Sequence, residues 1–205
     1  MVQRFFDAFC NELIGTEYGV EGLGQRGVAD LIETRACRVM DDLVSGVAGF
    51  LYAESRGPRS PEDFAINSLQ NAGLVFVMFD VKTRNEEAEF SMPNLISIER
   101  LWNILENVLE DIFYIFIEYS TEGDSAEITN VEIRHITNLS LDDLTIGNLG
   151  RGQLQIRDGA HRVGDSALDP GEWKGELASR AVQFNERLLD AVQNRIILWT
   201  ERRDA

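Results

Sequence analysis

The sequence predicts an α/β (α+β) fold in which a central mixed β-sheet is flanked by helices. Two long segments, at about 27–50 and 169–201, carry apolar residues at helical spacing. Two apolar strand-like runs, 63–69 and 74–82, are joined by a short turn, and further runs follow at 112–119 and 126–136. Strands interspersed with helices in this way are typical of a sheet covered by helices. At 205 residues, the chain is expected to form a single domain, residues 1–205.

The N-terminal half divides at its glycines and prolines. Residues 3–14 are predicted to form a short helix, and a glycine-containing loop separates it from the long helix. That second helix starts near residue 27 and is expected to include Val47 and Phe50, with Gly46 as a point where it can break. A break at 56–61 precedes the first strand, and residues 71–73 form the hairpin turn.

The C-terminal half begins with a polar loop at 86–91 and a helix predicted over 93–111, with Pro93 in its first turn. After the strands at 112–119 and 126–136, a loop or short helix around 140–149 leads to a strand at 152–157. Asp169, Pro170 and Glu172 form an N-cap, a first-turn proline and a capping box for the last helix. Its apolar face is expected to be buried: Trp173, Leu177, Phe184, Leu188, Val192, Ile196 and Trp199.

Composition excludes several classes of protein. The chain is 44% hydrophobic, no apolar run reaches the roughly 18 residues of a membrane span, and the N-terminus lacks signal-peptide features. We therefore expect a cytoplasmic protein without a membrane partner. Cys10 and Cys37 are expected to be buried free thiols; a disulfide is the alternative, and they are too few for a zinc site. The net charge of −16 argues against a nucleic-acid partner, but net charge does not describe a local cleft.

The basic residues are unevenly divided between arginine and lysine. The chain has 17 arginines and two lysines, Lys82 and Lys174. Arginine can replace lysine where a fixed positive charge is enough, but not where a compact ammonium or a movable proton is needed. Lys82, at the end of an apolar strand, is therefore a candidate for chemistry, with chance as the alternative.

Asp80 and Lys82 end the most hydrophobic strand of the sequence. Residues two apart on a strand point to the same face, so both charges project together next to the core. In a hairpin that turns at 71–73, Asp63 pairs near the level of 80–82. Two converging carboxylates repel unless a proton or cation intervenes, and Mg²⁺ accepts one or two carboxylates together with phosphate oxygens and water. This pattern fits phosphodiester hydrolysis; a structural ion pair between Asp80 and Lys82 fits the spacing equally well.

The residues around this motif resemble those of a known enzyme family. The stretch from Asp80 to Asn85 reads D-V-K-T-R-N, and P-N-L-I-S follows from Pro93 to Ser97. The stretch Ile156-Arg157-Asp158, followed by Glu172-Trp173, forms a second match near the C-terminus. Together these stretches resemble the HincII-type restriction endonucleases of the PD-(D/E)xK nuclease superfamily, over about 60 to 70 residues.

The resemblance implies a homodimer that binds double-stranded DNA at a short palindrome and cuts both strands with Mg²⁺, leaving 5′-phosphates. It makes Asp63 and Asp80 metal ligands and Lys82 the catalytic lysine. Because the hairpin is longer than in the family, Glu62 competes with Asp63. Glu33 is a further acidic candidate, although a solvated helix face is the expected role for it. DNA contacts are expected from Thr83, Arg84, Phe90, Ser91, Met92, Asn94, Arg151, Gln153 and Gln155.

Each of these contact residues also has a structural interpretation. Asn94 can cap the helix predicted to start there, and Phe90 and Met92 can pack in a dimer rather than wedge between base pairs. Three other functions compete with the restriction enzyme: a repair or structure-specific nuclease of the same superfamily, an acidic protein that binds DNA or a partner without cutting, and a domain whose ion pair is merely internal.

Overall fold

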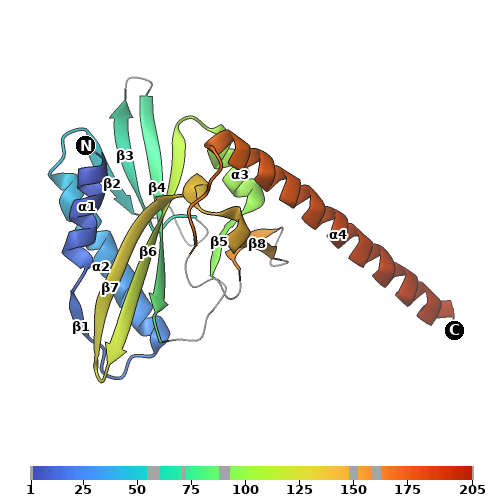
Figure 1. Cartoon of the computed structure of the whole chain (residues 1–205), viewed down its shortest axis with the longest axis horizontal. Helices are drawn as coiled ribbons and strands as arrows, with labels where there is room; N and C mark the ends of the chain where they lie inside the picture. Colours follow the sequence, from blue (N-terminus) through green and yellow to red (C-terminus); the bar gives the residue numbers. More distant parts are fainter. Residues whose placement is uncertain are drawn as a thin grey trace. The chain divides into compact units, whose positions relative to one another are not determined.

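The computed structural model describes residues 2–54, 61–70, 73–87, 93–147, 152–157 and 163–204 (Figure 1). The chain forms two compact units. The first comprises Met1–Pro93 and Leu101–Ile136, and the second comprises Asn94–Arg100 and Thr137–Ala205. That residues 1–205 act as a single domain stays a prediction.

The first unit is built on a six-stranded sheet with the order β1-β7-β6-β4-β3-β2. The strands are β1 (Glu17–Gly19), β2 (Phe50–Glu54), β3 (Phe64–Gln70), β4 (Gly73–Asn85), β6 (Glu110–Glu122) and β7 (Ser125–His135). Strands β4 and β6 run parallel, and all other neighbours are antiparallel. The prediction of a central mixed sheet is therefore confirmed, as is the hairpin of β3 and β4.

Two helices, α1 (Val2–Leu13) and α2 (Gln25–Ser45), pack against this sheet. Their buried residues, such as Phe9 and Ile32, share one core with Phe79 and Val81 of β4. Helix α2 ends at Gly46, the predicted point of a break, and the prediction that it includes Val47 and Phe50 was wrong. The backbone N–H of Gly46 bonds to the carbonyls of Leu43 and Val44 and ends the helix, and Phe50 instead begins β2 opposite Ser68.

Aromatic rings link the central strands on the helix-covered face. Phe64 of β3 and Phe79 of β4 stack with ring centroids 5.1 Å apart, and Phe113 of β6 continues the row 5.7 Å from Phe79. Such pairs contribute about 0.5–1.5 kcal/mol beyond the burial of their area. Because residues alternate along β4, burial of Phe79 and Val81 on this face directs Asp80 and Lys82 to the other.

The second unit contains a small sheet with the order β5-β9-β8, formed by β5 (Asn94–Ser97), β8 (Leu144–Gly147) and β9 (Gln153–Ile156). Strand β9 matches the predicted strand, whereas β8 was not predicted. The helix expected over 93–111 was wrong at both ends: α3 spans only Ile98–Glu106, because 94–97 pair with β9 and β6 begins at Glu110. Two short 3₁₀ helices, Ile136–Asn138 and Leu141–Asp143, lie between β7 and β8.

The last helix, α4 (Pro170–Asp204), starts as predicted. Asp169 Oδ1 accepts hydrogen bonds from the N–H groups of Gly171 and Glu172, and Glu172 Oε2 accepts one from the N–H of Asp169. The buried Trp173 donates from Nε1 to the carbonyl of Leu139 at 2.8 Å and fixes this end. The expected burial was wrong further along the helix, where Leu188, Val192, Ile196 and Trp199 are exposed.

Two other predictions concern the cysteines and the membrane. Cys10 and Cys37 are free and half-buried, as expected of unpaired thiols. Within the described ranges, no helix combines the length and apolarity that crossing a membrane requires. The cytoplasmic location stays a prediction.

Candidate active site

Asp80 and Lys82 form an ion pair on the sheet face opposite the aromatic row. Lys82 Nζ donates to Asp80 Oδ1 at 2.6 Å. Asp80 is only 5% exposed, whereas the Lys82 side chain keeps 22% of its surface in solvent. The carboxylate is therefore fixed inside the sheet, and the ammonium reaches from it towards solvent.

Asp63 meets this pair from the neighbouring strand. Its backbone N–H donates to the carbonyl of Phe79 at 2.8 Å, which places it directly before β3 at the level of Asp80. Its Oδ2 accepts a hydrogen bond from the N–H of Val81 at 2.7 Å, and its carboxyl is also within hydrogen-bonding reach of the Asp80 carboxyl. The predicted hairpin register thus brings Asp63, Asp80 and Lys82 together.

The electrostatics of the cluster favour a bound proton or cation. Burial raises the pKa of Asp80 from 3.8 to about 7; Lys82 opposes this shift, and Asp63 adds to it. A carboxyl with this pKa is only partly ionised near neutral pH, because no positive charge fully compensates its desolvation. A divalent cation between Asp63 and Asp80 would supply that compensation.

Glu33 of α2 belongs to the same electrostatic cluster. Its pKa is raised from 4.5 to about 7, first by burial and then by the charge of Asp63, while Lys82 opposes the shift. The side chain is half-buried, so the expectation of a solvated helix face was wrong. Cys37, one helical turn further along α2, has its thiol pKa raised to about 11 by burial and by Asp63. Both residues therefore lie on the side of α2 that faces Asp63.

Tyr114 is a neighbour of the site that the sequence did not indicate. It lies opposite Asp80 in the parallel register of β4 and β6 and is fully buried. Burial first, and then the charge of Asp80, raise the pKa of its hydroxyl well above the usual value. That hydroxyl has no hydrogen-bond partner within the described part of the chain. In the sequence, a tyrosine within a run of apolar residues indicates a core position, so only the register of β4 and β6 shows that Tyr114 is a neighbour of Asp80.

The donor set fits magnesium better than a metal that needs more protein ligands. Among the described residues, no group of three or more histidine, cysteine or acidic side chains is arranged to hold a metal. Mg²⁺ requires only one or two carboxylates, with water and phosphate oxygens completing its shell. The adjacent carboxylates of Asp63 and Asp80 meet that requirement, and the raised pKa of Asp80 shows a deficit of positive charge there.

The other predicted residues are distributed differently. Arg84 shares the face of Asp80 and Lys82, with Nη1 3.6 Å from Glu118 Oε1, whereas strand alternation places Thr83 on the opposite face. Glu62 is buried at 3% exposure. Phe90, Ser91, Met92 and Arg151 lie outside the described residues.

Asn94 and Gln155 are partners in the second unit. Gln155 Nε2 donates to Asn94 Oδ1 across β5 and β9. Gln155 is buried, Gln153 is half-buried two residues earlier on β9, and Asn94 is exposed. The helix cap expected as an alternative for Asn94 was wrong, because Asn94 begins a strand.

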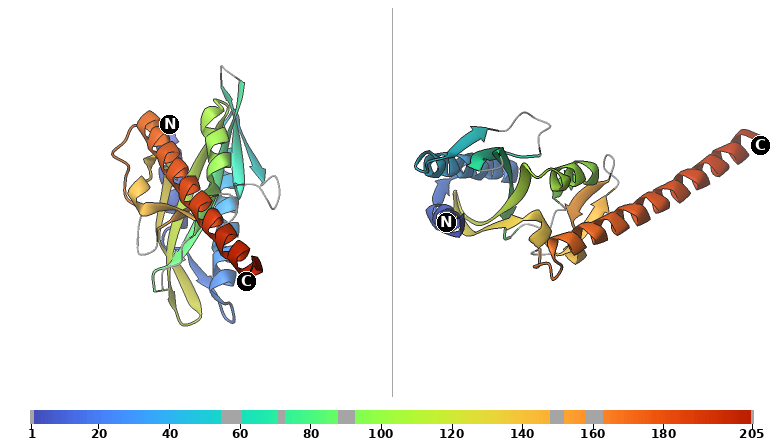
Figure 2. Two further views of the ribbon diagram at one scale, coloured as in Figure 1. Left: turned by 90° about the vertical axis from the view of Figure 1, so that its right-hand side faces the viewer. Right: turned by 90° about the horizontal axis from the view of Figure 1, so that it is seen from above.

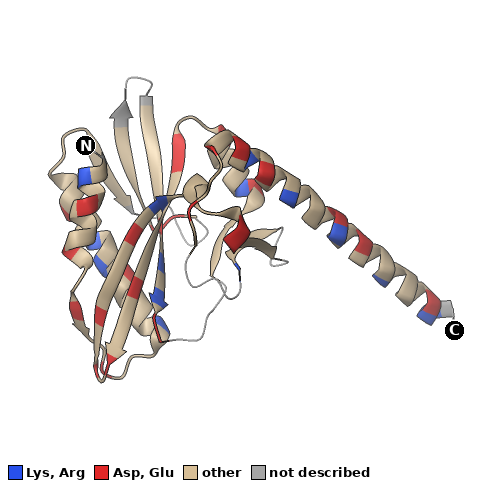
Figure 3. Ribbon diagram, in the orientation of Figure 1, with Lys and Arg blue, Asp and Glu red and all other residues tan. Residues whose placement is uncertain are grey.

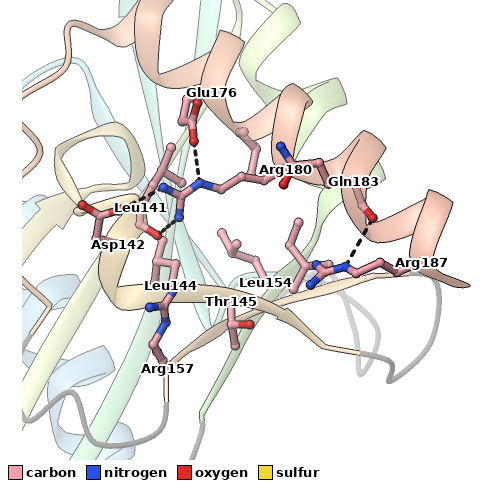
Figure 4. Close-up of a pocket in the computed structure, with 12 residues that line it drawn as sticks. Leu141, Asp142, Leu144, Thr145, Leu154, Arg157, Glu176, Arg180, Gln183 and Arg187 are labelled. Carbon is pink, nitrogen blue, oxygen red and sulfur yellow. Dashed lines mark hydrogen bonds and ion pairs between the residues drawn. The ribbon is translucent and has the colours of Figure 1, made fainter.

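A hollow of about 360 Å³ in the second unit gathers three arginines (Figure 4). Arg180 is anchored: Nε donates to Glu176 Oε1 at 2.7 Å, Nη2 donates to Asp142 Oδ1 at 2.8 Å, and Nη1 donates to the carbonyl of Leu141. Arg157 and Arg187 line the same hollow, and neither forms an ion pair with a carboxylate among the described residues. Their guanidinium groups are therefore available to an anion.

Comparison with known proteins gives a limited result. No protein-family model matches the sequence, and no curated protein is similar to it. Among solved structures, the chain is similar to the NlaIV restriction endonuclease, with a TM-score of 0.49 and 13% sequence identity over 82% of this chain and 72% of that one. Similarity at this level assigns no activity, and the resemblance to HincII-type enzymes stays a prediction.

Proposed function

We propose that the protein is a magnesium-dependent endonuclease that cuts double-stranded DNA, of the type II restriction class. It acts as a homodimer that cleaves both strands of a short palindromic site and leaves 5′-phosphates. The observation that supports this proposal is the convergence of Asp63, buried Asp80 and Lys82 at one point of the sheet. A carboxylate pair with one ammonium beside it suits the hydrolysis of a charged phosphodiester.

Asp63 and Asp80 would hold Mg²⁺, which when bound stabilises negative charge on the phosphate and lowers the pKa of water. The hydrogen bond from the N–H of Val81 orients the Asp63 carboxylate. Lys82, held at Asp80 and partly exposed, donates a hydrogen bond to the phosphate oxygen or orients the attacking water. Tyr114 beneath Asp80 keeps water from the buried side of that carboxylate.

Digestion of mixed plasmid and phage DNA with magnesium tests the proposal. The wild type is expected to give discrete fragments whose ends share one palindrome, and Lys82→Ala is expected to give none. Lys174→Ala is the matched control, since it removes the other lysine, on α4, and should leave the fragments unchanged. A smear that depends on Lys82 would instead indicate a structure-specific or repair nuclease. The absence of cleavage at any salt concentration would favour a binding protein that does not cut, which the net charge of −16 suits.

The arginine hollow is proposed to contact the DNA backbone. The double variant Arg157→Gln with Arg187→Gln is expected to weaken DNA binding about tenfold at low salt. It should also make the slope of log affinity against log salt concentration shallower by about two, because that slope depends on the number of phosphate contacts. Arg180→Gln should instead lower stability, since it removes the anchor of α4. Fluorescence anisotropy with a labelled duplex measures the first effect. Equal affinity and equal salt slope for the wild type and the double variant would contradict it.

A further inference from the structure

Much of α4 has no covering within its own chain. Every described side chain from Asn185 to Arg203 is exposed, and α4 continues well past the strands of its own unit (Figure 2). Large exposed apolar side chains are nevertheless concentrated in α4 from residue 182 onwards: Val182, Leu188, Leu189, Val192, Ile196, Ile197, Leu198 and Trp199. A contiguous exposed apolar surface of this kind marks an interaction site.

Six residues of this region follow the spacing of a two-stranded coiled coil. Val182, Asn185, Leu189, Val192, Ile196 and Trp199 are separated by three, four, three, four and three residues. This alternation is the a/d heptad pattern that aligns side chains along one helix face over about 26 Å. The five apolar members are 39 to 63% exposed. We refer to these six residues as the α4 seam.

The charge of this segment sets it apart from the rest of the chain. Residues 182–204 contain four acidic residues and four arginines, whereas the whole chain has a net charge of −16. Figure 3 shows both signs distributed along α4. Because two copies of so acidic a chain repel each other, the neutral segment is the part through which they can meet at least electrostatic cost.

We propose that the α4 seam binds the α4 seam of a second copy as a two-helix pair. Asn185, the polar seam residue, lies near the end of the contact, and its amide already donates to the carbonyl of Ala181 at 2.8 Å. Val192, Ile196 and Trp199, which were predicted to be buried in α4, are then buried between chains. This proposal names the surface for the homodimer of the proposed function; its test needs no DNA, so its outcome and that of the cleavage test are separate.

Sedimentation of the full chain tests the contact. The wild type is expected to have about twice the monomer mass of 23.1 kDa at micromolar concentration. Leu189→Glu with Ile196→Glu should raise the dissociation constant at least about 100-fold, because two large apolar contacts are lost in each copy. Ile197→Glu with Leu198→Glu adds the same charge at exposed positions off the seam and should leave the dimer intact. Circular dichroism checks that helix content is equal. A monomeric wild type, or dissociation by the off-seam variant alone, would overturn the proposal.

Discussion

Asp80→Asn is expected to abolish cleavage and, in the absence of metal, to raise the free energy of unfolding above pH 7 by about 4 kcal/mol. Burial raises the pKa of Asp80 from 3.8 to about 7, and each pKa unit corresponds to about 1.4 kcal/mol. Above pH 7 the wild type must hold an ionised carboxylate in a buried position. Asparagine has a similar shape without that charge, and Lys82 keeps access to solvent when its partner is lost.

The sign of this effect depends on pH. Between about pH 4 and 7 the folded state binds a proton at Asp80 that the unfolded state has released, so wild-type stability falls as pH rises through this range. The variant lacks this titration, and its stability advantage should therefore disappear near pH 4. Urea unfolding with EDTA at pH 4, 6 and 8 measures the difference.

Asp142→Asn is the matched control for Asp80→Asn. The pKa of Asp142 is lowered by its hydrogen bond from Arg180 and by the Arg180 charge, so removing that carboxylate should not stabilise the protein at any pH. Cleavage should also persist, since Asp142 lies in the other unit. If Asp80→Asn were less stable than the wild type at pH 8, the ion pair with Lys82 would be stabilising, and the internal ion-pair alternative would gain support.

The candidate cluster of Asp63, Asp80 and Lys82 could be predicted from the sequence because it depends on local rules. Alternation along β4 separates Asp80 from Phe79, and the turn at 71–73 fixes which residue of β3 lies opposite. The positions of Glu33 and Tyr114 near this cluster do not follow from these local rules. Glu33 on α2 is close enough to Asp63 for their charges to interact, and the parallel pairing of β4 with β6 sets Tyr114 opposite Asp80. Neither proximity is encoded by spacing along the chain.

The wrong predictions share a physical cause. The run Leu95-Ile96 continues smoothly into the apolar face of α3, and periodicity alone does not distinguish a short strand from a helical turn. Only pairing with β9 decides it, and that strand comes about 60 residues later. In α4, periodicity correctly showed an apolar face, but no local rule states whether the same chain or another copy covers it.

Magnesium binding is expected to be about 100-fold weaker at pH 5 than above pH 7. The proposed ligand Asp80 has a pKa of about 7, so below that pH a proton competes with the metal and costs about tenfold in affinity for each pH unit. Glu33, also with a pKa of about 7, should add to the slope through its charge near Asp63. Calorimetry in buffers of different ionisation enthalpy should show proton release upon binding at pH 6 and little at pH 8.

Two variants test how much Glu33 contributes to the pH dependence of magnesium affinity. Glu33→Gln should make the pH dependence shallower without abolishing binding, because it removes a neighbouring charge and leaves Asp63 and Asp80 in place. Glu99→Gln, which removes an exposed carboxylate on α3, should leave the whole profile unchanged. Affinity that is independent of pH, or binding that persists undiminished in Asp80→Asn, would place the metal elsewhere. Asp80, whose ionised carboxylate is expected to destabilise the metal-free protein above pH 7, is thus also the residue expected to make the site bind its cation.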